Sequence, residues 1–329
     1  MTARLTAPFS AALVALLAGA AALVSPRAAA QALPSAPPSD AHATEATAPE
    51  AMPSGEPDAP DAEARIVCVG GALTEIVFAL GAGDRVVGVD SGSTWPPEAR
   101  ERGQLGYQRA LSAEGVLALH PSLVLVTPDA GPPEALQQLR DAGVALRVLP
   151  AELTPDGALA RIAAVAQALG RPAQGEALRE ALQRDLDQAR DLLAAARARE
   201  PSPPRVLCVY ARGPGALFAC GAGTALDAMV ALAGGLNALG DLRGGHPLGA
   251  ESALAAAPDA IVLPAGSAEI CGGTEALLAD AGLQHTPAGR ARRVIVLDDL
   301  PLTGFGPRMG AALVELVRAL HEPAPGSTR

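Results

Sequence analysis

The chain has 329 residues, of which 49% are hydrophobic, 18% are charged and only 2% are aromatic. Acidic residues outnumber basic ones by 35 to 25, and the net charge of −10 argues against a nucleic-acid coat protein. All 25 basic residues are arginine, which excludes a Schiff-base lysine and a Gly-Lys-Ser/Thr phosphate loop. Gly-x-Ser-x-Gly, His-Glu-x-x-His and Gly-x-Gly-x-x-Gly are also missing, and this favours a binding protein over an enzyme.

Residues 1–30 have the pattern of an export signal. Arg4 supplies the positive start, residues 11–24 form an apolar run, and three alanines before Gln31 offer a cleavage site. The apolar run is shorter than the roughly 20 residues that a membrane span needs, although an uncleaved anchor remains the alternative. No cysteine follows at the usual lipidation position. We therefore expect a periplasmic protein that is soluble after the signal peptide is cleaved.

Residues 31–63 are rich in proline, alanine, serine and acidic residues, without any basic residue. Such a segment cannot bury enough apolar surface to offset its chain entropy. We expect a disordered tether here, and a second disordered tail at residues 323–329.

An internal repeat organises the rest of the chain. Residues 111–126 align without gaps with residues 248–263, an offset of 248 − 111 = 137, and six of the sixteen positions are identical. Each copy predicts a short helix, a proline stop and an apolar strand. Residues 72–77 and 225–230 form a second match. Two related halves follow from this repetition. The identical positions include Glu114 with Glu251 and Pro121 with Pro258.

The segment between the halves predicts one long helix. Residues 173–199 contain no proline, and their leucines and alanines recur at three- and four-residue spacing. About 25 helical residues would span roughly 37 Å. Strands that alternate with helices predict a parallel sheet in each half. We therefore expect two Rossmann-like α/β lobes, at 64–172 and 200–322, with a ligand cleft between them and little hinge closure.

Tyr107 is one of only two tyrosines and directly precedes the first copy of the repeated helix. Open α/β sheets place ligands in this region. Arg109 follows two residues later, so in an extended loop both side chains would point the same way. A neighbouring cation favours the phenolate, which is a hard oxygen donor suited to ferric iron and is known as a haem ligand. Simple packing of the tyrosine on a loop is the alternative.

Five further motifs extend over both halves of the chain: Val69–Val77, Gly106–Gly115, Gly223–Met229, Leu283–Arg290 and Gly304–Arg308. Through these motifs the chain resembles, from residue 65 to about residue 320, the periplasmic haem-binding proteins of bacterial ABC haem importers. The resemblance implies two lobes joined by a long helix, with Tyr107 as the axial iron ligand and Arg109 hydrogen-bonded to its oxygen.

The other side of the iron is less defined. Arg212 stands where some members of the family carry histidine, and because a charged arginine cannot ligate iron, a contact with a haem propionate fits it better. His246 is the repeat counterpart of Arg109, and an iron-ligand role, a propionate contact and an ordinary surface position all remain open for it. Tyr210 is expected to end a buried strand, and ligation of the iron is the alternative for it. Trp95 either packs against the macrocycle or covers the edge of its lobe.

Glu114 and Glu251 are candidates for contact with a transporter. Binding proteins of related importers dock onto their permease through one exposed glutamate in each lobe, and the resemblance implies this role here. A capping role can coexist with it, because Ser112 precedes the first helix and an acid in the first turn complements the helix dipole.

The four cysteines contain no Cys-x-x-Cys pair, which disfavours a metal site. Cys68 and Cys208 lie in apolar strand patterns, where cysteine often serves as a small hydrophobe. A disulfide between Cys208 and Cys220 requires their strands to be neighbours.

The sequence thus predicts a monomeric, non-enzymatic receptor that captures ferric haem b as its transported ligand. It would deliver the haem to an ABC permease with its ATPase subunits, without a catalytic cofactor or a nucleic-acid partner. A receptor for cobalamin or an iron siderophore is the alternative of the same fold, and a periplasmic enzyme using Glu75 or Glu251 as a base is a more distant one. The sixth iron ligand, the number of haems, the affinity and the identity of the permease stay open.

Overall fold

A computed structural model describes residues 64–213, 215–280 and 282–322. The expected signal peptide and both expected tails lie outside these residues. None of the described helices combines the length and apolarity needed to cross a membrane.

The first lobe is built on a five-stranded sheet whose neighbouring strands are all parallel, in the order β3-β2-β1-β4-β5. The central strands β1 and β4 are buried along their whole length, as expected for apolar runs covered on both faces. The strands are β1 (Ile66–Val69), β2 (Val86–Val89), β3 (Gly103–Gln104), β4 (Leu123–Val126) and β5 (Ala145–Val148). Helices α1 (Gly71–Ala79), α2 (Ala113–Leu117), α3 (Pro133–Asp141) and α4 (Pro155–Ala168) complete the lobe, with short 3-10 turns at Gly83–Arg85 and Pro97–Glu101.

The second lobe has a mixed sheet, so the expectation of a wholly parallel sheet is wrong here. Strands run in the order β11-β10-β6-β7-β9, with β8 paired to β6, and β7 is antiparallel to both of its neighbours. A tight turn returns the chain from β6 to β7, and Gly215 in this turn has a φ of 70°, which glycine adopts without strain. The strands are β6 (Arg205–Ala211), β7 (Leu217–Cys220), β8 (Leu236–Asn237), β9 (Gly245–Pro247), β10 (Ala260–Pro264) and β11 (Val294–Leu297).

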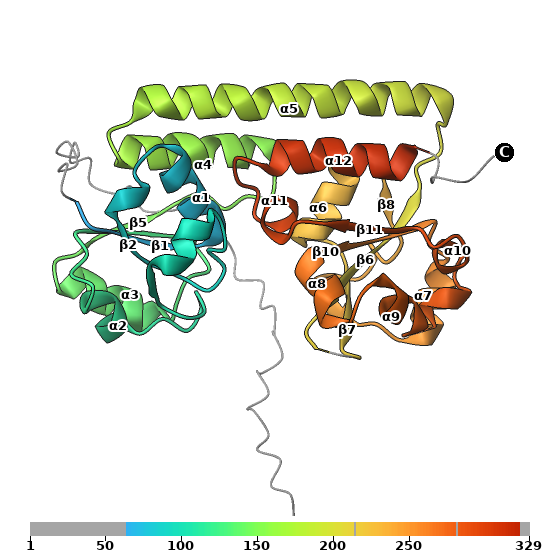
Figure 1. Cartoon of the computed structure of the whole chain (residues 1–329), viewed down its shortest axis with the longest axis horizontal. Helices are drawn as coiled ribbons and strands as arrows, with labels where there is room; N and C mark the ends of the chain where they lie inside the picture. The colour runs from blue at the N-terminus through green and yellow to red at the C-terminus, as the bar shows by residue number, and fades with distance from the viewer. Residues whose placement is uncertain (1–63, 214, 281, 323–329) are drawn as a thin grey trace, which may run out of the picture. The chain divides into compact units, whose positions relative to one another are not determined.

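The remaining helices surround this sheet (Figure 1). They are α6 (Ala225–Leu232), α7 (Ala250–Ala256), α8 (Ala265–Ile270), α9 (Thr274–Ala279), α10 (Pro287–Arg290), α11 (Asp299–Thr303) and α12 (Met309–His321), with a 3-10 turn at Leu283–His285.

The two copies of the internal repeat also have the same secondary structure and a similar backbone conformation. Helix α2 and strand β4 occupy the first copy, and helix α7 and strand β10 occupy the second. His120 and Ala257, which are equivalent at the 137-residue offset, both have left-handed backbones, with φ of 47° and 42°. Each directly precedes the proline of its copy, where the helix has ended. The two halves therefore share an unusual turn as well as residue identities.

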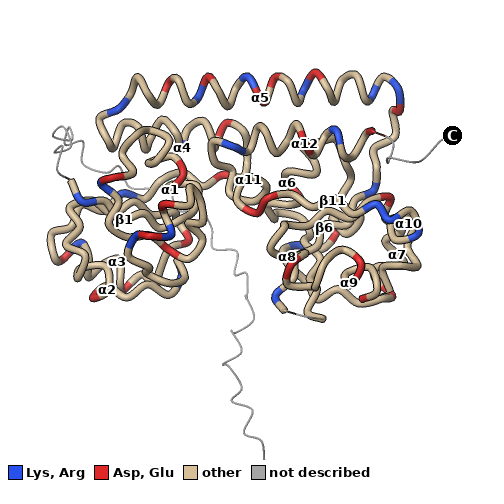
Figure 2. Tube along the Cα trace, viewed as in Figure 1, with Lys and Arg blue, Asp and Glu red and all other residues tan. Residues whose placement is uncertain are grey.

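Helix α5 (Pro172–Arg199) begins within one residue of the expected start and ends at the expected residue. It packs along α4 of the first lobe and α12 of the second (Figure 1). Its buried positions include Leu182, Leu186 and Ala189, while charged residues of both signs line the helix (Figure 2). One apolar cluster contains these leucines together with Leu73 of the first lobe and Val206 of the second, so the lobes share a continuous core.

Candidate functional site

Tyr107 and two aspartates lie at the carboxyl edge of the first sheet. Tyr107 follows β3, Asp90 follows β2 and Asp129 follows β4, and parallel strands end at a common edge. The strand order changes direction around β1, which is where sheets of this kind bind ligands. Tyr107 is 56% exposed, so its phenol is open to solvent.

The loop that carries Tyr107 is a turn, and the expectation of an extended segment is wrong. The amide of Ala110 donates to the carbonyl of Tyr107 at 2.8 Å, and the amide of Gly131 donates to the carbonyl of Gln108 at 2.9 Å. Gly131 in turn accepts from the amide of Leu111 at 2.8 Å. These bonds fix the tyrosine loop to the segment after β4. The alternation of side chains in an extended strand therefore does not apply to Tyr107 and Arg109.

Arg109 is held by Asp129 in this structure. Its Nη2 and Nε donate to Oδ2 of Asp129 at 2.9 Å and 3.2 Å, and Gln108 Nε2 donates to the same oxygen at 2.7 Å. Thr127 Oγ1 donates to the other carboxylate oxygen at 2.7 Å. Burial raises the pKa of Asp129, but the hydrogen bonds from Thr127 and Arg109 outweigh it and hold that pKa below its usual range. An ionised Asp129 thus fixes one edge of the Arg109 guanidinium.

Asp129 was not predicted from the sequence as a site residue, although its position after a buried strand could have indicated it. Asp129 lies three residues after the last residue of β4, at the same edge of the sheet as Tyr107. A carboxylate in that place is a natural partner for an arginine on a neighbouring loop.

Asp90 is a second positioning residue that was missed. It is 1% exposed, and its carboxylate accepts from the amide of Gly70 at 2.9 Å, from Ser93 Oγ at 2.6 Å and from the amide of Gly92 at 3.0 Å. These bonds shape the loop that leads to Trp95.

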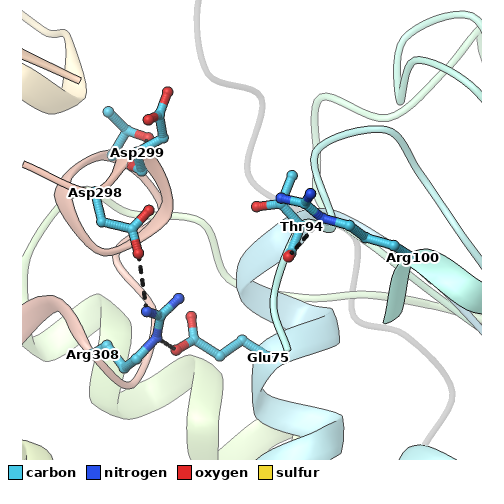
Figure 3. A network of polar contacts seen from close by, with 7 residues as sticks. Glu75, Thr94, Arg100, Asp298, Asp299 and Arg308 are labelled. Carbon is cyan, nitrogen blue, oxygen red and sulfur yellow. Dashed lines mark hydrogen bonds and ion pairs between the residues drawn. The ribbon is translucent and has the colours of Figure 1, made fainter. Parts of the chain in front are cut away.

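Trp95 contacts the second lobe through Arg308, which directly precedes α12. The guanidinium carbon lies 4.4 Å from the ring centroid, a cation–π contact. The same arginine donates from Nε to Glu75 of α1 and from Nη1 to Asp298 at 3.1 Å (Figure 3). Burial raises the pKa of Glu75, and the hydrogen bond and charge of Arg308 oppose this rise without cancelling it. Glu75, considered above as an enzymatic base, is thus buried in an ion pair between the lobes.

Arg161 of α4 forms another link between the lobes. This side chain is 2% exposed and donates to the carbonyls of Gly304 at 2.9 Å and Phe305 at 3.0 Å in the second lobe, and to that of Pro150 at 2.5 Å.

The second-lobe candidates lie on two different faces of one sheet. Arg212 follows β6, is exposed, and lies 4.7 Å from the ring centroid of Phe218. His246 in β9 is opposite Ala219, the residue next to Phe218, so the histidine belongs to the other face. Its Nε2 is 2.9 Å from the carbonyl oxygen of Arg243. Tyr210 lies within β6 and is 42% exposed, so the expectation that it ends a buried strand is wrong for its side chain.

Glu114 and Glu251 are exposed in the first turns of α2 and α7. Neither carboxylate has a hydrogen-bond or ion-pair partner among the described residues. Ser112 caps α2 as expected, since its Oγ accepts from the amide of Gly115 at 3.2 Å. In the second copy, Ser252 Oγ accepts a hydrogen bond from the amide of Gly249 and donates one to the carbonyl of the same residue.

Known proteins share this architecture. The family described as "Periplasmic binding protein" matches residues 66–300. The periplasmic heme-binding protein RhuT from Roseiflexus sp. RS-1 is 46% identical, with a TM-score of 0.74 over 79% of this chain and 98% of that chain. A periplasmic heme-binding protein from Pseudomonas aeruginosa is 35% identical, with a TM-score of 0.71 over 80% and 94% of the two chains.

Another relative, the vitamin B12-binding protein of Pectobacterium atrosepticum, is 27% identical over 207 residues, which cover 63% of this chain and 73% of that protein. The family match begins at β1 and ends within α11, so it includes both sheets and the connecting helix. The chain belongs to the periplasmic binding protein family.

Proposed function

We propose that this protein captures ferric haem in the periplasm and delivers it to an inner-membrane ABC importer. The observation that carries the proposal is the exposed phenol of Tyr107 at the ligand-binding edge of the first sheet. Two solved relatives with 46% and 35% identity are heme-binding proteins by name, which supports the same ligand here.

The chemistry of the site suits an iron porphyrin. A phenolate from Tyr107 would bind the ferric ion directly, as tyrosine does in some haem proteins. Arg109 uses Nε and Nη2 for Asp129, and its guanidinium has further N–H groups that would donate to the bound phenolate. Because an anionic oxygen donor prefers the higher charge, reduction to ferrous iron should weaken binding. No chemical transformation of the haem is required.

The second lobe would supply the remaining contacts. We assign Arg212 to a haem propionate, since its guanidinium is exposed and fixed over Phe218. His246 lies on the other face of that sheet and is the weaker candidate for either a propionate contact or an iron bond. Trp95 would border the porphyrin with the part of its side chain that is exposed.

Glu114 and Glu251 would dock the protein onto the permease. Both are exposed and free of partners within the described residues, so each is available to an arginine on a transporter. We propose a monomer that acts with a permease and its ATPase subunits and carries no catalytic cofactor.

A haemin titration tests the iron ligand. Wild-type protein should develop a Soret band and a charge-transfer band typical of ferric haem bound to phenolate, and Tyr107→Phe should lose the charge-transfer band. Tyr210→Phe is the matched control, because it alters the only other tyrosine and should leave the spectrum unchanged. No spectral change in the wild type, or identical spectra for wild type and Tyr107→Phe, would refute the proposal.

Cobalamin is the second candidate ligand, because the Pectobacterium relative is a vitamin B12-binding protein by name. Calorimetric titration with cyanocobalamin distinguishes the two. Tighter binding of cyanocobalamin than of haemin, unaffected by Tyr107→Phe, would establish cobalamin instead. Siderophore complexes of iron can be screened in the same assay.

A further inference from the structure

Two of the four cysteines, Cys208 and Cys220, lie on the neighbouring strands β6 and β7. Strands β6 and β7 are antiparallel, with Val209 opposite Ala219 and Tyr210 opposite Phe218. Extending this register by one residue places Cys208 opposite Cys220, the last residue of β7. Residues directly opposed in an antiparallel pair have Cα atoms about 4.5–5.5 Å apart, which lies within the roughly 4.4–6.8 Å that a disulfide spans.

Both cysteine side chains lie on the same face of the sheet. Cys208 and Cys220 pack in the same apolar cluster. The neighbours of Cys208 in β6, Leu207 and Val209, belong to a different cluster on the other face of the sheet. Burial raises the pKa of Cys208, and negative charge on Cys220 raises it further. Cys208 is 1% exposed, while Cys220 is only partly buried.

We propose that Cys208 and Cys220 form a disulfide that joins β6 to β7 in the exported protein. All four cysteines are free thiols in the structure, and an oxidising periplasm supplies the conditions for joining two of them. Cys68 occupies the equivalent position in β1, but the residues opposite it are Val89 and Leu125. The bond is therefore specific to the second lobe.

The oxidant is the disulfide of a thiol–disulfide oxidoreductase, for which oxidised glutathione is a substitute in vitro. The Cys220 thiolate attacks one sulfur of that disulfide and releases the other as a thiolate. Cys208 then loses its proton and attacks the Cys220 sulfur, which releases the second thiol of the oxidant. The two cysteines lose two protons and two electrons, and the oxidant's disulfide is reduced to two thiols.

This bond closes a short loop at the base of the hairpin that carries Tyr210 and Arg212. Burial raises the pKa of Cys220 to about 11, with Arg212 opposing the rise, so few thiolates exist in the folded chain at neutral pH. We therefore expect the bond to form while the exported chain folds, and oxidation of the folded reduced protein to be slow.

Thiol counting on the exported full chain tests the proposal. The protein is unfolded in denaturant with an alkylating reagent, and modified cysteines are identified by mass spectrometry. We expect Cys68 and Cys271 to be modified and a peptide pair to link Cys208 with Cys220. Reduction should expose all four thiols and lower the thermal midpoint by roughly a few degrees.

Two variants complete the experiment. Cys208→Ala should expose Cys220 to the reagent and abolish the effect of reduction on the midpoint. Cys68→Ala, the matched control in the other lobe, should retain the linked peptides. Four modified cysteines in the wild type, or a bond involving Cys68 or Cys271, would overturn the proposal. Because the count is made in denaturant, a variant that folds poorly leaves the wild-type result decisive.

Discussion

At the scale of single residues, the proposed site includes a carboxylate, that of Asp129, whose observed partner is Arg109. Asp129 holds Arg109 through two hydrogen bonds while Arg109 remains 60% exposed. A solvent-exposed ion pair of this kind contributes at most about 1 kcal/mol to stability. Its value lies in orientation, because an arginine already fixed by one partner loses less freedom when it donates to a second.

Asp129→Asn should therefore weaken haemin binding by roughly tenfold or less, while the free energy of unfolding changes by no more than about 1 kcal/mol. The asparagine keeps the shape of the side chain but removes the charge that orients Arg109. Haemin titration and urea unfolding of the same samples separate the two effects. Asp141→Asn, at the far end of α3, is the control. An unchanged haemin affinity in Asp129→Asn would show that haem binding does not need the ion pair between Asp129 and Arg109.

The pH dependence of this ion pair follows from the lowered pKa of Asp129. A carboxyl whose folded pKa lies below its unfolded value adds stability above the unfolded pKa and loses that contribution as pH falls through the folded pKa. The anchor of Arg109 is therefore complete at neutral pH and is lost only under acid conditions.

At the scale of elements, the sequence predicted the parts that depend on regular periodicity. Helix α5 and the repeated helix–strand pairs follow from spacing and were found where expected. The hairpin between β6 and β7 was missed, because an apolar run does not reveal the direction of its neighbour. The turn at Tyr107 was missed because it is fixed by hydrogen bonds to Gly131, more than twenty residues away.

The repeated helices α2 and α7 carry the proposed docking residues. Charge reversal of both, in Glu114→Arg with Glu251→Arg, should abolish haem uptake in cells, because repulsion replaces attraction at each contact with the transporter. Haemin affinity of the purified variant should stay unchanged. Growth on haem as the iron source, measured beside the titration, checks both expectations.

The matched control reverses the charge of two exposed glutamates elsewhere, in the double variant Glu180→Arg on α5 with Glu315→Arg on α12. This control has the same change in net charge, so it should retain uptake. Loss of uptake in both double variants would point to net charge rather than to docking by α2 and α7.

At the scale of the whole described chain, the lobes are joined by more than the connecting helix. They share an apolar core, Arg161 reaches two carbonyls of the second lobe, and Glu75 pairs with Arg308. These contacts join elements that are far apart in the sequence, and no local pattern predicts such pairs. They favour a ligand that is held with little movement of the lobes.

The buried Glu75 gives this junction a measurable signature. Burial raises its pKa in the folded chain above the ordinary glutamate value, so the folded state binds the proton more tightly than the unfolded state does. Stability from this group is therefore present below the ordinary glutamate pKa, and falls as pH rises from there through the raised folded pKa. Glu75→Gln removes the titration and should flatten the decline over that window. Urea unfolding at a series of pH values measures it, with exposed Glu180→Gln as control. If Glu75→Gln keeps the wild-type slope, the group that titrates across this window is not at the junction of the lobes.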